Sequence, residues 1–153
     1  MRLSELLAPD AVVPDLSGTD LSAVLEQLCA PLASLGQFTA KALAQALLDR
    51  EKLGSTGIGG GVAIPHARVP GYERLRASFG RSAAGLDFKA PDGAPARFIV
   101  ALIAPAAAAG PHVTALGRIS RVFRHKEIHE ALAKAGSAEE IYRLLLEEDQ
   151  RSG

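Results

Sequence analysis

Hydrophobic residues recur at helical spacing in the first third of the chain. They predict one helix that begins after a cap at Thr19 or Asp20 and runs to about Leu35, where Gly36 would end it. A second helix is predicted from an N-cap at Thr39 to Gly54. The apolar positions of the two segments are Leu21, Val24, Leu25, Leu28, Leu43, Ala46 and Leu47. Residues 1–18 are mixed and indicate a short apolar turn, followed by turn chemistry.

The middle of the chain has the pattern of strands. Residues 62–64 predict a short strand, and Pro65, which has no N–H for a sheet, would leave His66 where that strand ends. Residues 98–103 are apolar at every position, which is typical of a central strand covered on both faces. Residues 77–81 and 86–88 are weaker strand candidates, and Asp92-Gly93 predicts the turn of a hairpin.

The last third of the chain returns to helical spacing after a loop of small residues, 104–110. Pro111 suits a first helical position, with Gly110 before it. Ser137 and Glu140 predict a capping box for the final helix, and residues 147–153 are expected to fray. The apolar stripes of the three segments are Val113, Leu116, Ile119, Val122 and Phe123; Ile128, Leu132 and Ala135; and Ile141, Leu144 and Leu145.

Helices at both ends of a strand-rich middle indicate the fold class. We expect an α/β sandwich in which a central mixed β-sheet is flanked by helices on both sides, rather than a purely alternating doubly wound fold. The length of 153 residues suits a single domain over 1–153, with about 5–148 as its ordered core.

Composition narrows the classes of function. Lys+Arg and Asp+Glu both number 17, which argues against a strong electrostatic attraction to nucleic acid or to an anionic membrane. No apolar run reaches the roughly 18 residues of a membrane span, and no signal peptide is evident, so we expect a cytoplasmic protein without membrane insertion. The one cysteine, Cys29, is expected to be a small buried residue.

The strongest chemical candidate is His66, which follows a glycine-rich loop and a rigid proline. Neutral imidazole is a nucleophile at physiological pH and forms covalent intermediates. A phosphoryl group on such a ring needs hydrogen-bond donors, which fixed hydroxyls and backbone N–H groups can provide. The candidate donors in the loop are Ser55, Thr56, Gly57, Gly59 and Gly61.

Two further residues are candidates for the same site. His112 would lie in the first turn of a helix, whose N-terminus favours phosphate oxygens, and Arg50 could bring a fork of donors. From the residues alone, a structural role for His66 and His112 stays open, such as a hydrogen bond to a carbonyl. Metal binding is a weaker alternative, because no acidic or cysteine ligand cluster is near them in the sequence.

Residues 50–66, which end in Gly61-Val62-Ala63-Ile64-Pro65-His66, resemble the active-site segment of the enzyme IIA domains of the bacterial phosphotransferase system. The match is to the mannitol/fructose class and is closest to the nitrogen-type proteins. Residues 98–105, 112–116 and 137–146 resemble other segments of that family, so the likeness covers nearly the whole chain. Ala67 departs from it, since glycine is common at this position.

The resemblance implies a function and its residues. His66 would accept phosphate from a histidine phosphocarrier protein (HPr or its nitrogen-type counterpart NPr), His112 would support it, and Arg50 matches the family's active-site arginine. Neither a metal nor a cofactor is implied. In the nitrogen type the phosphate serves as a regulatory state, read by partners such as potassium transporters or sensor kinases.

Two alternatives stay open within this interpretation. One is a sugar-transport enzyme IIA component for fructose or mannitol. The other is a binding module of the same fold in which phosphorylation plays no role. The presence of both His66 and His112 argues against the second alternative.

Overall fold

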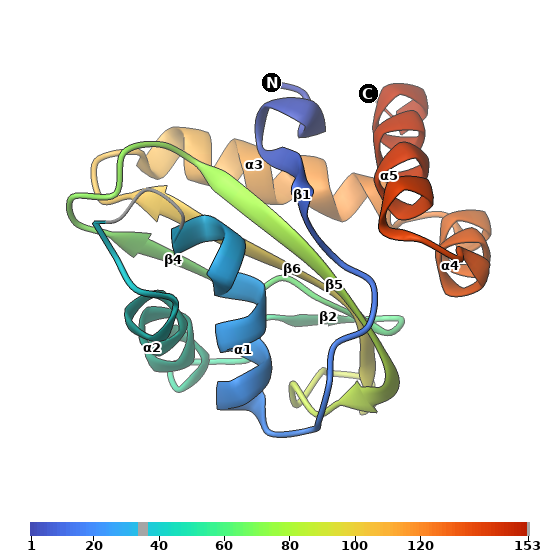
Figure 1. The fold of residues 1–153 in the computed structure, drawn as a ribbon, viewed down its shortest axis with the longest axis horizontal. Coiled ribbons are helices and arrows are strands. Elements are labelled where there is room, and N and C mark those ends of the chain that lie inside the picture. Colours follow the sequence, from blue (N-terminus) through green and yellow to red (C-terminus); the bar gives the residue numbers. More distant parts are fainter. Residues whose placement is uncertain (34–36, 153) are drawn as a thin grey trace.

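The computed structural model describes residues 1–33 and 37–152, which form a mixed β-sheet with helices on both faces (Figure 1). The strand order is β1-β5-β6-β3-β2, and β4 also pairs with β6. The strands are β1 (Leu7–Val13), β2 (Gly57–Gly59), β3 (Val62–Ala63), β4 (His66–Val69), β5 (Arg76–Leu86) and β6 (Ala96–Pro105). The predicted fold class is therefore confirmed.

Helices α1 and α2 cover one face of the sheet, and α3, α4 and α5 cover the other (Figure 1). Their bounds are α1 (Leu21–Cys29), α2 (Ala40–Glu51), α3 (Ala109–Val122), α4 (Lys126–Lys134) and α5 (Ala138–Ser152), with short 3-10 helices at Leu3–Glu5 and Ala30–Ala33. Alternate residues of β6 enter the two cores: Ile99 and Ile103 pack with α1 and α2, whereas Val100 and Leu102 pack with the other helices. The prediction of a central strand covered on both faces is confirmed.

Side-chain caps fix the starts of three helices as the sequence predicts. Asp20 accepts a hydrogen bond from the Ala23 N–H, and Thr39 accepts one from the Ala42 N–H. Ser137 accepts one from the Glu140 N–H, while the Glu140 carboxylate turns back to the Gly136 N–H instead of the Ser137 N–H. These predictions are confirmed because each cap involves only residues within one helical turn.

The N-terminal segment differs from expectation, because residues 7–13 form a strand that runs parallel to β5. Its pairing shifts register between Leu7 and Val12, and Pro9 and Asp10 lie exposed in that irregular stretch. The irregularity interrupts the alternation by which a strand is detected in a sequence.

Two helix bounds also differ. The first helix ends at Cys29 and continues as a 3-10 turn over Ala30–Ala33, because Pro31 has no N–H to continue an α-helix. Leu35 and Gly36, the predicted end and stop, lie outside the described residues. The predicted fraying of residues 147–153 is wrong over its described part, since α5 extends to Ser152.

Buried charges explain why α5 extends so far. Asp149 is 3% exposed, accepts the Leu3 N–H and binds the Arg118 guanidinium with both carboxylate oxygens. Glu148, also buried, binds Arg151 and Ser152. A charge-assisted bond between residues 146 positions apart holds the end of α5 against the start of the chain.

Candidate active site

The junction between β3 and β4 sets the position of His66. Strand β3 pairs with β6 at Phe98 and Ile99, and β4 resumes the same parallel pairing at Leu102. Between them the Ile64 N–H donates to the Thr56 oxygen, and Pro65, which has no N–H, accepts the Leu102 N–H from β6. His66 is therefore the first residue of β4, which corrects the prediction that it ends a strand.

The Ile64 carbonyl is hydrogen-bonded to the His66 side chain. His66 Nδ1 lies 2.7 Å from this oxygen. Since a carbonyl can only accept, Nδ1 carries the proton and Nε2 keeps its lone pair. Burial lowers the pKa of His66 and the bond to Ile64 opposes this, while the charge of Arg50 lowers the pKa and that of Glu51 raises it. The ring is thus favoured in its neutral form with Nε2 as the nucleophilic atom.

His112 lies edge-on to His66, with ring centroids 5.2 Å apart and planes at 72°. It is 8% exposed, and within the described residues its Nε2 has no hydrogen-bond partner. Its pKa is lowered by burial first and then by the charges of His66, Arg68 and Arg50. A buried ring nitrogen without a partner is costly, so it indicates a polar atom that this site is built to receive.

The start of α3 differs in detail from the prediction. The helix begins at Ala109 rather than at Pro111, and the His112 N–H already donates to the Ala108 oxygen. His112 belongs to the buried stripe of this helix, whereas Val113, predicted in that stripe, is 70% exposed. His112 therefore offers its side chain, and not its backbone, to the site.

Arg50 approaches from the last turn of α2. Its Nη1 donates to the Gly54 oxygen at 3.0 Å, which ties the guanidinium to the start of the glycine-rich loop. Its charge acts on the pKa of both His66 and His112, so the structure brings the three predicted residues into one neighbourhood.

The donors of Ser55, Thr56 and Gly57 are engaged elsewhere in this structure. Ser55 Oγ donates to the Phe88 oxygen and accepts the Gly57 N–H, and Thr56 donates its N–H and hydroxyl to the Glu51 carboxylate. Gly59, the last residue of β2, and Gly61, in the turn that follows, have φ of +85° and +84°, values that favour glycine. The role of these five residues as phosphate donors stays a prediction.

Sequence reasoning missed Arg68, because the strand that carries it was not predicted. In β4 the side chains of Ala67 and Val69 enter the core with α1 and α2, so His66 and Arg68 project together toward the α3 side. Arg68 is exposed and lines an open depression with Arg50 at the edge of the sheet. Residues two positions apart in a strand lie on the same side, so the spacing of His66 and Arg68 is the signal that would have found Arg68.

The other two histidines lie apart from this neighbourhood. His125 lies 3.8 Å from buried Glu148. His129 is partly buried against Phe98 and Phe123 and bonds to the Phe123 oxygen. Across residues 1–33 and 37–152, no group of three or more His, Cys, Asp or Glu side chains is placed to hold a metal ion. None of the helices described combines the length and apolar character needed to cross a bilayer.

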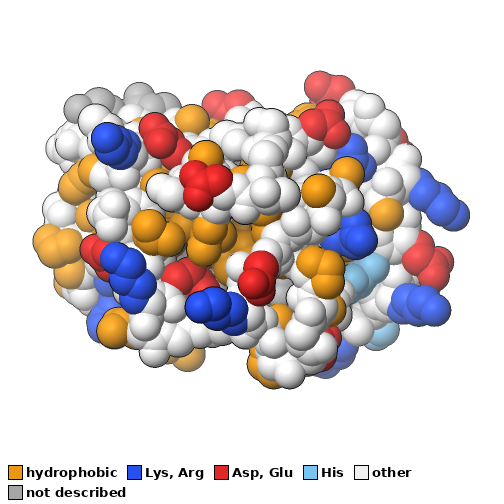
Figure 2. Space-filling view, turned by 90° about the horizontal axis from the view of Figure 1, so that it is seen from below, with side chains coloured by type: hydrophobic (Ala, Val, Ile, Leu, Met, Phe, Trp, Pro, Cys, Tyr) orange, Lys and Arg blue, Asp and Glu red, His pale blue; other side chains and the backbone are white. Residues whose placement is uncertain are grey.

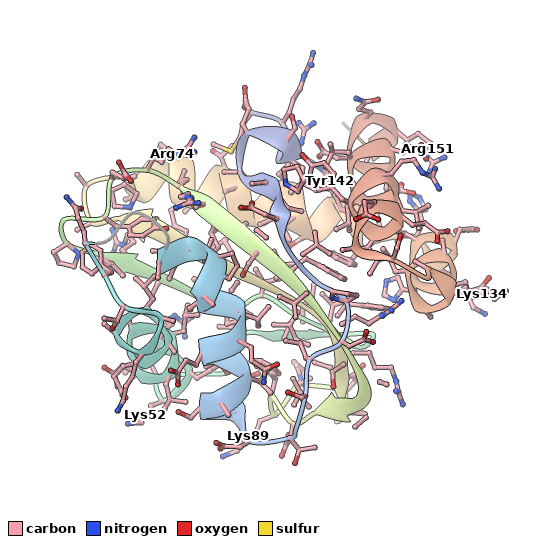
Figure 3. All side chains as sticks on the ribbon, in the orientation of Figure 1. Lys52, Arg74, Lys89, Lys134, Tyr142 and Arg151 are labelled. Carbon is pink, nitrogen blue, oxygen red and sulfur yellow. The ribbon has the colours of Figure 1, made fainter. Side chains whose placement is uncertain are left out.

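A separate hollow opens on the face shown in Figure 2, where hydrophobic side chains gather between charged ones. Leu21, Leu48 and Phe88 line it, together with Lys52 and Lys89, which extend toward solvent at that end of the molecule (Figure 3). Neither His66 nor His112 is among its lining residues. The hollow is therefore distinct from the histidine pair.

Comparisons with known proteins agree with this geometry. The family model described as "Phosphoenolpyruvate-dependent sugar phosphotransferase system, EIIA 2" matches residues 5–148. The nitrogen regulatory protein of Bradyrhizobium diazoefficiens is 37% identical over 145 residues, 95% of each chain. That of Pseudomonas aeruginosa is 34% identical over 148 residues, 96% of each chain. The crystal structure of the nitrogen regulatory protein IIA-Ntr from Neisseria meningitidis superposes with a TM-score of 0.86 at 34% identity, covering 94% of this chain and 98% of that one.

Proposed function

Since the chain belongs to the EIIA 2 family of the phosphoenolpyruvate-dependent sugar phosphotransferase system, we propose that His66 accepts a phosphoryl group from a histidine phosphocarrier protein. The observation that carries the proposal is the hydrogen bond from His66 Nδ1 to the Ile64 oxygen. It fixes the ring orientation and leaves Nε2 as the atom that attacks.

The transfer conserves atoms and charge in one displacement. The Nε2 lone pair of His66 forms a new N–P bond while the N–P bond on the carrier's histidine breaks. The electron pair of the broken bond returns to the carrier's ring, which leaves as neutral imidazole when its second nitrogen holds a proton. His66 keeps its Nδ1 proton and gains positive charge, which the Ile64 carbonyl stabilises through the existing hydrogen bond.

Arg50 and His112 stabilise the phosphoryl oxygens in this proposal. The guanidinium of Arg50 has nitrogens beyond Nη1, and these can bind oxygens of the transferring group. The unpartnered Nε2 of His112 provides a further donor when that nitrogen carries the proton.

The phosphate acts as a regulatory mark rather than as a group in transit to a sugar. This part of the proposal is supported by the relatives named nitrogen regulatory proteins, which match this chain over nearly their whole length. The readers of the mark would be protein partners such as potassium transporters or sensor kinases, each favouring the phosphorylated or the unphosphorylated form.

The direct test is phosphorylation in vitro. The protein is incubated with phosphoenolpyruvate, enzyme I and the histidine phosphocarrier protein, and the intact mass is measured before and after acid treatment. We expect one acid-labile phosphoryl group, lost in His66→Ala and kept in His125→Ala, which removes an exposed histidine away from the pair. The absence of an adduct in the unsubstituted protein, or its persistence in folded His66→Ala, refutes the proposal.

A further inference from the structure

Arg68 lies in the strand that begins at His66, close to the candidate site. It follows His66 by two residues on the same side of β4, on the face toward α3. Within residues 1–33 and 37–152, no hydrogen bond or ion pair involves its guanidinium. Its charge is nonetheless close enough to His112 to lower the pKa of that ring.

The site lacks donors for the group it would hold. A phosphoryl group on a ring nitrogen presents three oxygens with spread negative charge. Arg50 already commits Nη1 to Gly54, and His112 can offer one N–H. Ser55, Thr56 and Gly57 direct their donors into the loop itself. Among the charged residues around His66, Arg68 keeps all five N–H donors of its guanidinium.

The two arginines reach the edge of the sheet from different directions. Arg50 comes from α2, which packs on the face that Ala67 and Val69 enter, and Arg68 comes from the opposite side of β4. Both line the same open depression, whose lining also includes the carboxylate of Asp49, an exposed side chain paired with Lys52. The charges of both arginines act on His112, whose ring centroid lies 5.2 Å from that of His66, so a dianionic group on His66 would lie near two guanidinium groups.

We propose that Arg68 is a second phosphate-binding residue, which holds the oxygens of the phosphoryl group on His66 from the α3 side while Arg50 holds them from the α2 side. The inference rests on the proposed phosphorylation of His66 and adds a residue to it. Arg68 binds equatorial oxygens and exchanges no proton, and the bonds made and broken are those of the transfer to His66 Nε2.

The test compares Arg68→Gln and Arg68→Lys with Arg74→Gln, which removes the same charge from the exposed segment between β4 and β5 (Figure 3). Single-turnover phosphorylation is measured with the phosphocarrier protein and with phosphoramidate, a small donor that requires no protein docking. We expect Arg68→Gln to slow both reactions roughly 10- to 100-fold, as for the loss of a charge-assisted hydrogen bond. Arg68→Lys should recover part of the rate, and Arg74→Gln should match the unsubstituted protein.

An NMR titration of His112 provides a second measurement that does not depend on turnover. Arg68→Gln should raise the pKa of His112, because a nearby positive charge is removed, whereas Arg74→Gln should leave it unchanged.

The outcomes separate this inference from the function on which it rests. If the unsubstituted protein forms no adduct, the proposed function fails. If it forms one and Arg68→Gln is equally fast with both donors, Arg68 does not bind the phosphoryl group. A slower reaction with the carrier protein alone would assign Arg68 to docking and also overturn the inference.

Discussion

His66 Nδ1 and the carbonyl oxygen of Ile64 lie 2.7 Å apart, so the active ring is held by the backbone of its own segment. Pro65 still accepts the Leu102 N–H from β6, while the Ile64 N–H donates to the Thr56 oxygen and the Ile64 carbonyl accepts the His66 ring. The backbone of this short segment therefore fixes which ring nitrogen carries the proton.

This bond predicts the position of the phosphoryl group on the ring. We expect phosphorylation on Nε2, because Nδ1 is engaged as a donor. NMR of the phosphorylated protein, with ¹⁵N in its histidine rings, identifies the nitrogen coupled to phosphorus. An adduct on Nδ1 would contradict the assignment and require the ring to leave Ile64.

Partly buried His66 and buried His112 predict how stability depends on pH. Burial lowers the pKa of His66 and of His112 below the ordinary value of 6.5. The unfolded chain therefore binds protons first as the pH falls, and the free energy of unfolding should decrease from pH 6.5 downward, toward the folded-state pKa values. Urea unfolding across this range measures the decrease, which should be smaller in His112→Asn. An equal decrease in that variant would show that other groups cause it.

Substitution of Asp149, near the end of α5, is expected to lower the free energy of unfolding strongly. Asp149→Ala leaves the Leu3 N–H and the Arg118 guanidinium without their buried partner. The expected loss is about 3 kcal/mol in the free energy of unfolding. Glu147→Ala, which breaks an exposed pair with Arg143 in the same helix, is the matched control and should cost less than about 1 kcal/mol. Similar losses for the two variants in urea unfolding would contradict the structural role of Asp149.

An added methyl group is expected to have opposite effects on the free energy of unfolding at two glycines, Gly80 and Gly117. A Cβ on Gly80 in β5 would lie 2.6 Å from Leu16 Cδ1 and 2.7 Å from Leu28 Cδ2, so Gly80→Ala should destabilise the protein by about 1–3 kcal/mol. Gly117 lies within α3 with open space around it, so Gly117→Ala should stabilise by about 0.5–1 kcal/mol. Thermal unfolding of both variants checks the signs, and a stabilising Gly80→Ala would refute the close contact.

The features that the sequence predicts well are those set by neighbours along the chain. Thr39 and Ser137 act within one helical turn, and the apolar run of β6 needs only its own residues to indicate burial on both faces. The family motif likewise occupies one continuous segment that ends at His66. Such features can be predicted correctly because they do not depend on contacts with residues far away in the sequence.

What the sequence could not predict depends on distant partners. The strand pattern of residues 7–13 is broken by Pro9 and Asp10, and only the pairing with β5 makes the segment a strand. In the sequence, Glu148 and Asp149 look like charged residues of a frayed tail. In the structure they are bound by Leu3, Arg118 and Ser152. The position of Arg68 on the same side as His66 depends on β4, and this strand is defined by its pairing with β6.

The bond between Leu3 and Asp149 also bears on how the protein is made. During synthesis the first strand leaves the ribosome before any of its partners, and the carboxylate that binds Leu3, just before this strand, is translated 146 positions later. Nascent chains that lack α5 should therefore expose the apolar side of β1, and this stretch is where a chaperone would bind a partly synthesised molecule.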